Sequence, residues 1–301
     1  MSRNDPTPNL KTFDWANAEY IARVLPGDSH VHSEWSWDAP RGDMERTAAR
    51  AVELGVPTVA FTEHADWTHW NMHGATVQKG TSASVVDDVL IARPLEVDGY
   101  LGCIRLCRER FPQLQILSGV ELSEPHLHPA ETARLLASGD FDRVLGSVHT
   151  LLDLSRQGRV EVTVAYRQRP ALDVVRGYLD EARQLAASDA PFAVLAHLDY
   201  PLRRPEYWRE GPFDWLMVED EARAVLEALA GSGRALEVNT RTPVPVTLLK
   251  WWHEAGGGAV SFGSDAHEPG RVARDFAAAA GLAEMCGYRS GDRLGDLWGR
   301  A

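Results

Sequence analysis

The stretch MERTAARAVELGVPTVAFTEH, residues 44–64, contains one complete unit of the pattern that decides the fold. Apolar side chains recur at helical spacing over residues 44–54, and Gly55 is typical of a helix end. Residues 57–62 are a short apolar run that indicates a buried strand. Glu63 and His64 follow at the predicted end of that strand. The unit is a helix, a strand and then a pair of ionisable side chains.

The same unit recurs along the chain. It predicts further helices over residues 95–111, 130–137, 174–187, 219–230 and 246–255, and further strands over residues 114–120, 144–148, 192–196, 235–238 and 259–264. With a first strand around His30, the sequence predicts seven strands separated by helices. Strands that alternate with helices form parallel βαβ units, and seven such units suit a barrel. We predict an α/β fold of one domain over residues 1–301, with residues 1–22 as an N-terminal extension and residues 67–98 as a loop region over the active site.

Composition limits the class of partner. The formal net charge of −12 argues against a nucleic-acid backbone as partner but leaves a small anionic substrate open. Three cysteines without a CxxC motif predict reduced thiols rather than a disulfide scaffold. With no signal-peptide pattern and no apolar stretch near 18 residues, we expect no membrane span and a cytoplasmic protein. The oligomeric state stays open.

Ionisable side chains gather where the predicted strands end. In a (β/α) barrel the carboxyl ends of the strands meet at one rim, where catalytic groups collect. Any one of these residues alone could be a hydrogen-bonded rim residue, but the whole set favours a metal site. The candidates are His30, His32, Asp38, His64, Glu121, His149, His197, Asp265 and His267.

Metal chemistry explains this choice of residue types. Imidazole and carboxylate are ligands of zinc, iron and manganese. Nine ligands exceed what one ion takes, so we expect two to three divalent cations, with Glu121 able to bridge two of them through its two oxygens. Two cations that share a hydroxide can hold both ends of an in-line displacement at phosphorus.

Seven segments together resemble the polymerase and histidinol phosphatase (PHP) superfamily, and in particular its histidinol-phosphate phosphatase-like branch. They are DSHVHS (28–33), FTEHAD (61–66), SGVELS (118–123), GSVHT (146–150), LAHLDYPLR (195–203), LEVNT (236–240) and FGSDAH (262–267). The resemblance implies a distorted seven-stranded (β/α)7, TIM-like barrel with a trinuclear metal site. It also implies hydrolysis of a small phosphate monoester by a metal-bridging hydroxide.

The resemblance implies a role for each ligand. The first cation would be bound by His30, His32, Glu121 and Asp265. The second would be bound by Glu121, His149 and His197, and the third by Asp38, His64 and His267. Asp38 has a nearby competitor in Glu34. Glu121, Asp265 and His267 are the predicted catalytic groups, and the acid that protonates the leaving group is left open between a metal-bound water and the region of Asp265 and His267.

Arginine and asparagine side chains are candidates for substrate contact, because arginine binds phosphate through two parallel hydrogen bonds. The candidates are Arg203, Arg204, Asn239 and Arg241, with Arg271 as a further possibility. Each could also be an ordinary surface or loop residue. The leading substrate is L-histidinol phosphate.

Two loops depart from the pattern of the branch. Residues 67–73 carry Trp67, Trp70 and His73, and residues 125–128 carry two further histidines. They form either a lid that selects the substrate or loops packed on themselves. Two alternatives to the monoesterase stay open: a phosphodiesterase or exonuclease acting on nucleotides, and a non-catalytic metal-binding PHP protein.

Overall fold

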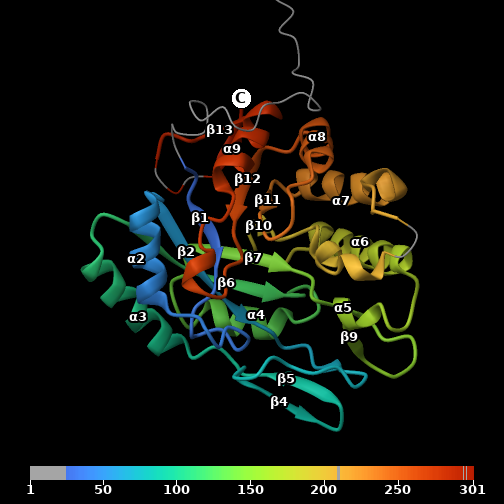
Figure 1. Ribbon diagram of the computed structural model, residues 1–301. Helices are drawn as coiled ribbons and strands as arrows, with labels where there is room; N and C mark the ends of the chain where they lie inside the picture. The colour runs from blue at the N-terminus through green and yellow to red at the C-terminus, as the bar shows by residue number, and fades with distance from the viewer. Residues whose placement is uncertain (1–24, 209–210, 294, 296) are drawn as a thin grey trace, which may run out of the picture.

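The structure is a computed structural model that describes residues 25–208, 211–293, 295 and 297–301 (Figure 1). The predicted N-terminal extension, residues 1–22, lies outside the described residues. Within the described part of the chain, no helix combines the length and the apolar character needed to cross a membrane.

The main sheet has nine strands in a curled α/β arrangement. Seven of them are parallel and follow one another in chain order, and two short antiparallel strands extend the sheet beyond β12. The parallel strands are β1 (Asp28–Val31), β2 (Thr58–Ala65), β6 (Gln115–Ser123), β7 (Arg143–Ser147), β10 (Val194–Leu195), β11 (Ala235–Asn239) and β12 (Ala259–Gly263), and the antiparallel ones are β14 (Trp298–Arg300) and β13 (Tyr288–Arg289). All seven predicted strands are confirmed.

The first parallel strand also lies beside the segment that follows the last one. Val31 forms a parallel bridge with Ala266. The His32 N–H donates to the Ala266 carbonyl at 2.8 Å, and the Asp265 N–H donates to the His30 carbonyl at 2.8 Å. The sheet therefore curls far enough to bring residues 30–32 against residues 265–266, which places two of the predicted ligand segments side by side.

Helices cover the outside of this sheet (Figure 1). The six predicted helices are confirmed to within three residues at each end. The structure adds a short helix and an alanine-rich helix that is apolar on most sides and therefore lacks a helical polar–apolar period. The helices are α2 (Met44–Leu54), α3 (Val97–Arg110), α4 (Pro129–Leu136), α5 (Val162–Ala165), α6 (Ala171–Ala187), α7 (Glu219–Gly231), α8 (Val246–Glu254) and α9 (Phe276–Met285).

A second, five-stranded sheet is built from the connection between β2 and α3 and the connection between β7 and α5. Its order is β4 (Ala83–Val86), β5 (Val89–Ala92), β3 (Trp70–Asn71), β9 (Arg159–Glu161) and β8 (Thr150–Leu152). Three of these strands lie within residues 67–98, which the sequence predicts as a loop region. Strands of two to four residues are too short to show a period of two, so the sequence pattern does not reveal them.

Glu181 on α6 connects this second sheet to the rest of the molecule. Its Oε2 lies 2.8 Å from Arg159 Nη2 on β9, and its Oε1 lies 3.1 Å from His126 Nε2 in the segment after β6. Burial by itself raises the pKa of Glu181. Hydrogen bonding with His126 and Arg159 outweighs burial and holds the pKa below its usual value. The folded state therefore favours the ionised carboxylate, so this contribution to stability is present above the unfolded-state pKa and is lost as the pH falls.

We predict that Glu181→Gln lowers the free energy of unfolding by about 1–3 kcal/mol at pH 7, because Arg159 then has no anionic partner. The deficit should shrink as the pH falls from about 4 through the lowered folded-state pKa of Glu181, because the wild-type carboxylate is then also protonated. Denaturant titrations from pH 7 down to about pH 2 measure this. Asp180→Asn is the matched control on the same helix, since Asp180 is 61% exposed in its pair with Arg183. A deficit independent of pH would contradict the assignment.

Candidate metal centre and substrate pocket

The structure brings all nine predicted ligands together at the carboxyl ends of the parallel strands. Four groups of three ligand atoms each lie within 4.8 Å of one another: His32, His64 and His267; His30, His32 and Glu121; His30, His197 and Asp265; and His64, Glu121 and His149. Asp38 joins them through contacts with His64 and His267. Strands β1, β2 and β6 supply the first half of the cluster and the segments after β7, β10 and β12 supply the other half.

Glu121 lies at the middle of the cluster and is fully buried. Its Oε2 is 3.1 Å from His30 Nε2 and 3.3 Å from His32 Nε2. Its Oε1 is 2.7 Å from His197 Nε2 and 3.3 Å from His149 Nε2. Oε2 also lies 3.2 Å from His64 Nδ1. Each carboxylate oxygen therefore faces its own set of imidazole nitrogens, which is the arrangement that a bridging ligand needs.

A second group lies toward the open side of the cluster. His267 Nε2 is 3.0 Å from Asp38 Oδ2, and His267 Nδ1 is 3.4 Å from Asp265 Oδ1. His64 Nε2 lies 3.4 Å from Asp38 Oδ1. The imidazole rings of His64 and His32 stack at 4.2 Å between centroids. This group is contiguous with the first through His32, so the whole set forms one cluster.

The donor set fits divalent cations. His30 Nε2 and His32 Nε2 are 3.1 Å apart, and His149 Nε2 and His197 Nε2 are 3.3 Å apart. Two imidazole lone pairs aimed at one point repel each other unless a proton or a cation lies between them. Asp38 Oδ1 and His64 Nδ1 are moreover buried without a correctly oriented hydrogen bond to any described residue. Such atoms are costly to bury unless an ion or a water satisfies them.

The electrostatics of the cluster also favour cation binding. Burial raises the pKa of Glu121, but the imidazoles of His30, His64 and His149 outweigh burial and hold that pKa well below its usual range. Burial lowers the pKa of His64, but Asp38 and Glu121 outweigh it and raise that pKa to about 9. Burial lowers the pKa of His197 to about 4, so its imidazole is neutral at pH 7. Divalent cations bind the same lone pairs in competition with protons.

Three buried carboxylates that the sequence reasoning did not assign support the ligands from behind. Glu237 Oε1 lies 2.7 Å from His30 Nδ1, and Glu237 Oε2 accepts the His197 N–H at 2.7 Å. Glu63 accepts the Ser36 hydroxyl at 2.5 Å, and the same hydroxyl lies 3.0 Å from His32 Nδ1.

Asp66 is the third of these carboxylates, and its Oδ1 lies 3.6 Å from His149 Nδ1. Carboxylates behind metal-bound imidazoles fix the ring orientation and increase ligand basicity. Glu237 was visible in the sequence as a charge inside an apolar strand run, and Glu63 as a charge at the end of one. Such charges need a buried partner.

Two candidate ligands have a left-handed backbone. His197 has φ of 27° and Asp265 has φ of 50°. Such conformations cost a non-glycine residue free energy and persist where the surroundings impose them. Here the Asp265 N–H donates to the His30 carbonyl, and the His197 N–H donates to Glu237. The left-handed backbone of these two candidate ligands is thus held by hydrogen bonds to other residues of the cluster.

The structure separates the two candidates for the ligand in the loop after β1. Asp38 faces His64 and His267, as described above. Glu34 Oε2 instead accepts the Met44 N–H at 2.7 Å, at the first turn of α2. Glu34 therefore stabilises the N-terminus of a helix, where backbone N–H groups lack partners.

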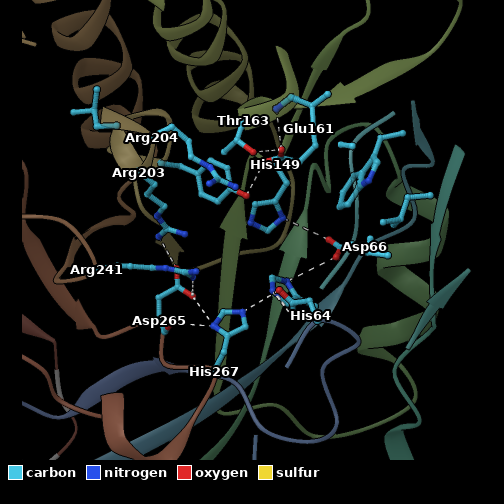
Figure 2. Close-up of a pocket in the computed structure, with 18 of the residues that line it drawn as sticks. His64, Asp66, His149, Glu161, Thr163, Arg203, Arg204, Arg241, Asp265 and His267 are labelled. Carbon is cyan, nitrogen blue, oxygen red and sulfur yellow. Dashed lines mark hydrogen bonds and ion pairs between the residues drawn. The ribbon is translucent and has the colours of Figure 1, made fainter. Parts of the chain in front are cut away.

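The cluster opens into a pocket of about 1040 Å³ (Figure 2). Figure 2 shows Arg203 and Arg241 pointing toward Asp265; Arg241 Nη1 lies 3.2 Å from Asp265 Oδ1. Arg204 lines the pocket and is half-exposed, with Glu206 3.6 Å away. Asn239 is buried: its amide nitrogen donates to Glu237 at 3.0 Å and its oxygen accepts the Arg241 N–H at 2.9 Å.

The two unusual loops take different positions. Trp70 lines the pocket, and its ring lies 5.7 Å from that of Trp37. Trp67 packs beside His128, with ring centroids 6.0 Å apart, and His128 Nε2 lies 2.8 Å from Thr68 Oγ1. Residues 125–128 are thus packed against the start of the first loop, while Trp70 is available to a ligand.

The sequence matches the PHP domain family over residues 28–241. A histidinol-phosphatase of Lactococcus lactis subsp. lactis is 25% identical over 248 residues, covering 80% of this chain and 83% of that protein. A probable histidinol-phosphatase of Clostridium acetobutylicum is 27% identical over 272 residues, covering 87% and 94%.

Solved structures share the fold. The crystal structure of the Lactococcus lactis histidinol phosphate phosphatase, complexed with zinc, L-histidinol and phosphate, superposes with a TM-score of 0.70 at 23% identity. The match covers 88% of this chain and 95% of that one. A putative histidinol phosphatase from Listeria monocytogenes gives a TM-score of 0.66 at 17% identity, covering 83% and 98%.

We predict that Asp38→Asn weakens the binding of one cation by about 10- to 100-fold, because it removes a charged ligand from the open side of the cluster. Glu34→Gln should leave the metal content unchanged and lower the free energy of unfolding by less than about 1 kcal/mol. Elemental analysis after dialysis against buffered zinc measures the first effect. The reverse pattern, with metal lost only in Glu34→Gln, would reassign the ligand.

We predict that Glu121→Gln loses most bound metal and about a hundredfold or more in phosphatase activity, because an amide cannot bridge two cations. Metal content and phosphate release are measured on the same sample. Glu206→Gln is the control, since Glu206 is an exposed carboxylate near the pocket rim. Retention of both metal and activity in Glu121→Gln would rule out a bridging role.

Proposed function

This chain belongs to the PHP domain family, and we propose that it is a metal-dependent phosphatase that hydrolyses L-histidinol phosphate. Relatives named as histidinol-phosphatases match more than three quarters of its length and of theirs. The observation that carries the proposal is the position of Glu121, whose two oxygens each face a different set of imidazole nitrogens beside a pocket with arginines.

We propose that the cluster holds two to three divalent cations, with zinc, iron and manganese all compatible with the ligands. His30, His32, Glu121 and Asp265 would hold the first cation, and Glu121, His149 and His197 the second. Asp38, His64 and His267 would hold the third. Bound there, the cations would lower the pKa of a water molecule that serves as nucleophile and would neutralise charge on the phosphoryl oxygens.

The chain's own residues supply position and charge. Glu237 and Glu63 fix the orientation of His30 and, through Ser36, of His32. Arg203 is nearly buried, and its guanidinium pairs with Asp265 and stacks on the Tyr200 ring at 4.6 Å. We therefore assign Arg203 to positioning Asp265, and Arg204 and Arg241 to direct contact with the substrate. Asn239 acts beneath the pocket by holding Glu237 and the backbone of Arg241.

The pocket has a polar and an apolar side. Trp37, Trp70 and Leu90 line one part of it, and Glu161 and Tyr200 line another. An alcohol leaving group that carries a ring and a cationic amine could pack on the indoles and face the Glu161 carboxylate. This combination supports a phosphorylated amino alcohol with an aromatic ring as substrate.

We also infer that the curled sheet is a distorted (β/α)7 barrel. The bridge between Val31 and Ala266 and its two backbone hydrogen bonds support this inference, because they connect the first parallel strand to the end of the last one. The location in the cytoplasm and the single-domain organisation stay predictions.

We expect L-histidinol phosphate to be hydrolysed with a kcat/KM at least about a hundredfold above that of p-nitrophenyl phosphate, because only the natural leaving group occupies the whole pocket. Phosphate release with metal-loaded protein measures this. Preferential hydrolysis of bis-p-nitrophenyl phosphate or mononucleotides would favour a phosphodiesterase. Hydrolysis of none of these by fully loaded protein would favour a non-catalytic role.

Arg241→Ala should raise KM for the monoester by about tenfold and leave metal content unchanged, because one charge-assisted contact to the phosphate is lost. Steady-state kinetics and elemental analysis separate the two effects. Arg176→Ala, at an arginine of similar exposure on α6, is the control for the charge change. An unchanged KM would place the phosphate elsewhere.

A further inference from the structure

A second pocket, of about 470 Å³, lies beside the first, and most of its lining residues have no role in the reaction proposed above. The two pockets share Asp38, Asp265 and His267 in their linings, so they meet at the open side of the metal cluster. We call the second one the arginine pocket, because four arginines line it: Arg41, Arg241, Arg271 and Arg274.

The topology brings these arginines together. Arg41 follows β1, Arg241 follows β11, and the other two follow β12. Strands β11 and β12 are neighbours, and β1 lies against the segment after β12. Four guanidinium groups from three chain segments therefore converge at one edge of the molecule.

Their recorded contacts leave the ends of three guanidinium groups available. Arg41 and Arg271 both contact Glu268 through Nε, at 3.2 and 3.3 Å, and Arg274 contacts Asp275 through Nε at 3.1 Å. Among the described residues, no hydrogen bond is made by the terminal nitrogens of these three side chains. These paired nitrogens form the planar fork that binds phosphate in a bidentate manner.

The local charge is opposite to that of the whole protein. The arginine pocket has four arginines against three carboxylates, and two of those carboxylates, Asp38 and Asp265, belong to the metal cluster. Glu268 is then the one carboxylate of the lining outside the metal cluster, and Asp275 pairs with Arg274 beside it, in a chain whose net charge is −12. The Ser264 hydroxyl and the Gln78 amide add neutral hydrogen-bonding groups to the lining. An anion in this pocket meets several donors and little repulsion.

The two pockets thus differ in the chemistry they accept. The larger one has the aromatic wall of Trp37 and Trp70 and can take the organic part of a monoester. In an in-line displacement at phosphorus, the nucleophile and the leaving group are on opposite sides of the phosphoryl group. A phosphoryl group at the junction of the two pockets would therefore direct its alcohol toward the aromatic wall of the larger pocket. The arginine pocket would lie on a different side of the phosphoryl group.

We propose that the arginine pocket is a phosphate-binding site separate from the metal cluster, and that it receives the phosphate ion after hydrolysis. The assignment of the bound phosphate as a product of hydrolysis rests on the proposed function. The same chemistry would also hold the second phosphate group of a doubly phosphorylated substrate. In both cases the ligand is a phosphate oxyanion bound by the forks of Arg271 and Arg274.

The test is the double variant Arg271→Ala/Arg274→Ala in the metal-loaded full-length protein. Its dissociation constant for inorganic phosphate at this pocket, measured by isothermal titration calorimetry, should rise by about tenfold or more, because two charge-assisted forks are lost. The inhibition constant of inorganic phosphate against p-nitrophenyl phosphate should rise in parallel. The lysine pair, Arg271→Lys/Arg274→Lys, keeps the charge but not the fork and should give an intermediate value.

The matched control is Arg176→Ala/Arg183→Ala on α6. These two arginines are also about half-exposed and each is paired with one carboxylate, at 3.0 Å in both cases. The control changes the net charge equally and should leave both phosphate constants unchanged. Circular dichroism of all variants confirms folding, and the lysine pair replaces the alanine pair if the latter does not fold.

A second substrate distinguishes product phosphate from the second phosphate group of a doubly phosphorylated substrate. If the alanine pair raises KM for fructose 1,6-bisphosphate but does not raise the phosphate constants, the pocket binds a second substrate phosphate and the product assignment is overturned. If neither value differs from the control pair, the site itself is overturned. Phosphate titration requires no turnover. Tight phosphate binding by a protein that hydrolyses no substrate would therefore support the phosphate-binding site and contradict the proposed phosphatase activity.

Discussion

The cluster depends on one buried carboxylate placed between two groups of imidazoles. Glu121 lies on β6, where the parallel register sets it opposite His64 of β2 and Leu145 of β7. A shift of one residue in this register would turn Glu121 to the other face of the sheet. The order of the sheet, the curl that brings β1 to the end of β12 and the positions of the ligands are therefore parts of one geometric constraint.

Burying so many ionisable groups is unfavourable unless they compensate one another. A buried carboxylate requires positive charge and hydrogen bonds close by. Here the imidazoles lower the pKa of Glu121, and Glu63, Asp66 and Glu237 support those imidazoles from the side away from the cluster. Cations bound by the same atoms would stabilise the fold as well as the reaction, since they bind the folded cluster and not the unfolded chain.

The sequence predicted that these side chains lie together because most of the candidate ligands stand at the end of an apolar strand run, and such ends are easily recognised. His30 and His32, two residues apart in an extended segment, project the same way, and the structure places both beside Glu121. Long amphipathic helices such as α6 were predicted for the same reason. The choice between Asp38 and Glu34 needed three dimensions, because both residues lie in one loop and only the path of the chain directs Glu34 to α2.

What the sequence did not predict is built from short segments and distant partners. The second sheet pairs β3 with β9, which are almost ninety residues apart, through strands of two and three residues. The arginine pocket likewise depends on segments after three different strands. Anomalous diffraction from crystals grown with zinc tests the bridging role of Glu121 most directly. We predict two or three zinc peaks, with one peak within about 2.0–2.2 Å of each oxygen of Glu121. The absence of zinc at Glu121, or a single peak that contacts only one of its oxygens, would contradict the bridging role on which the account depends.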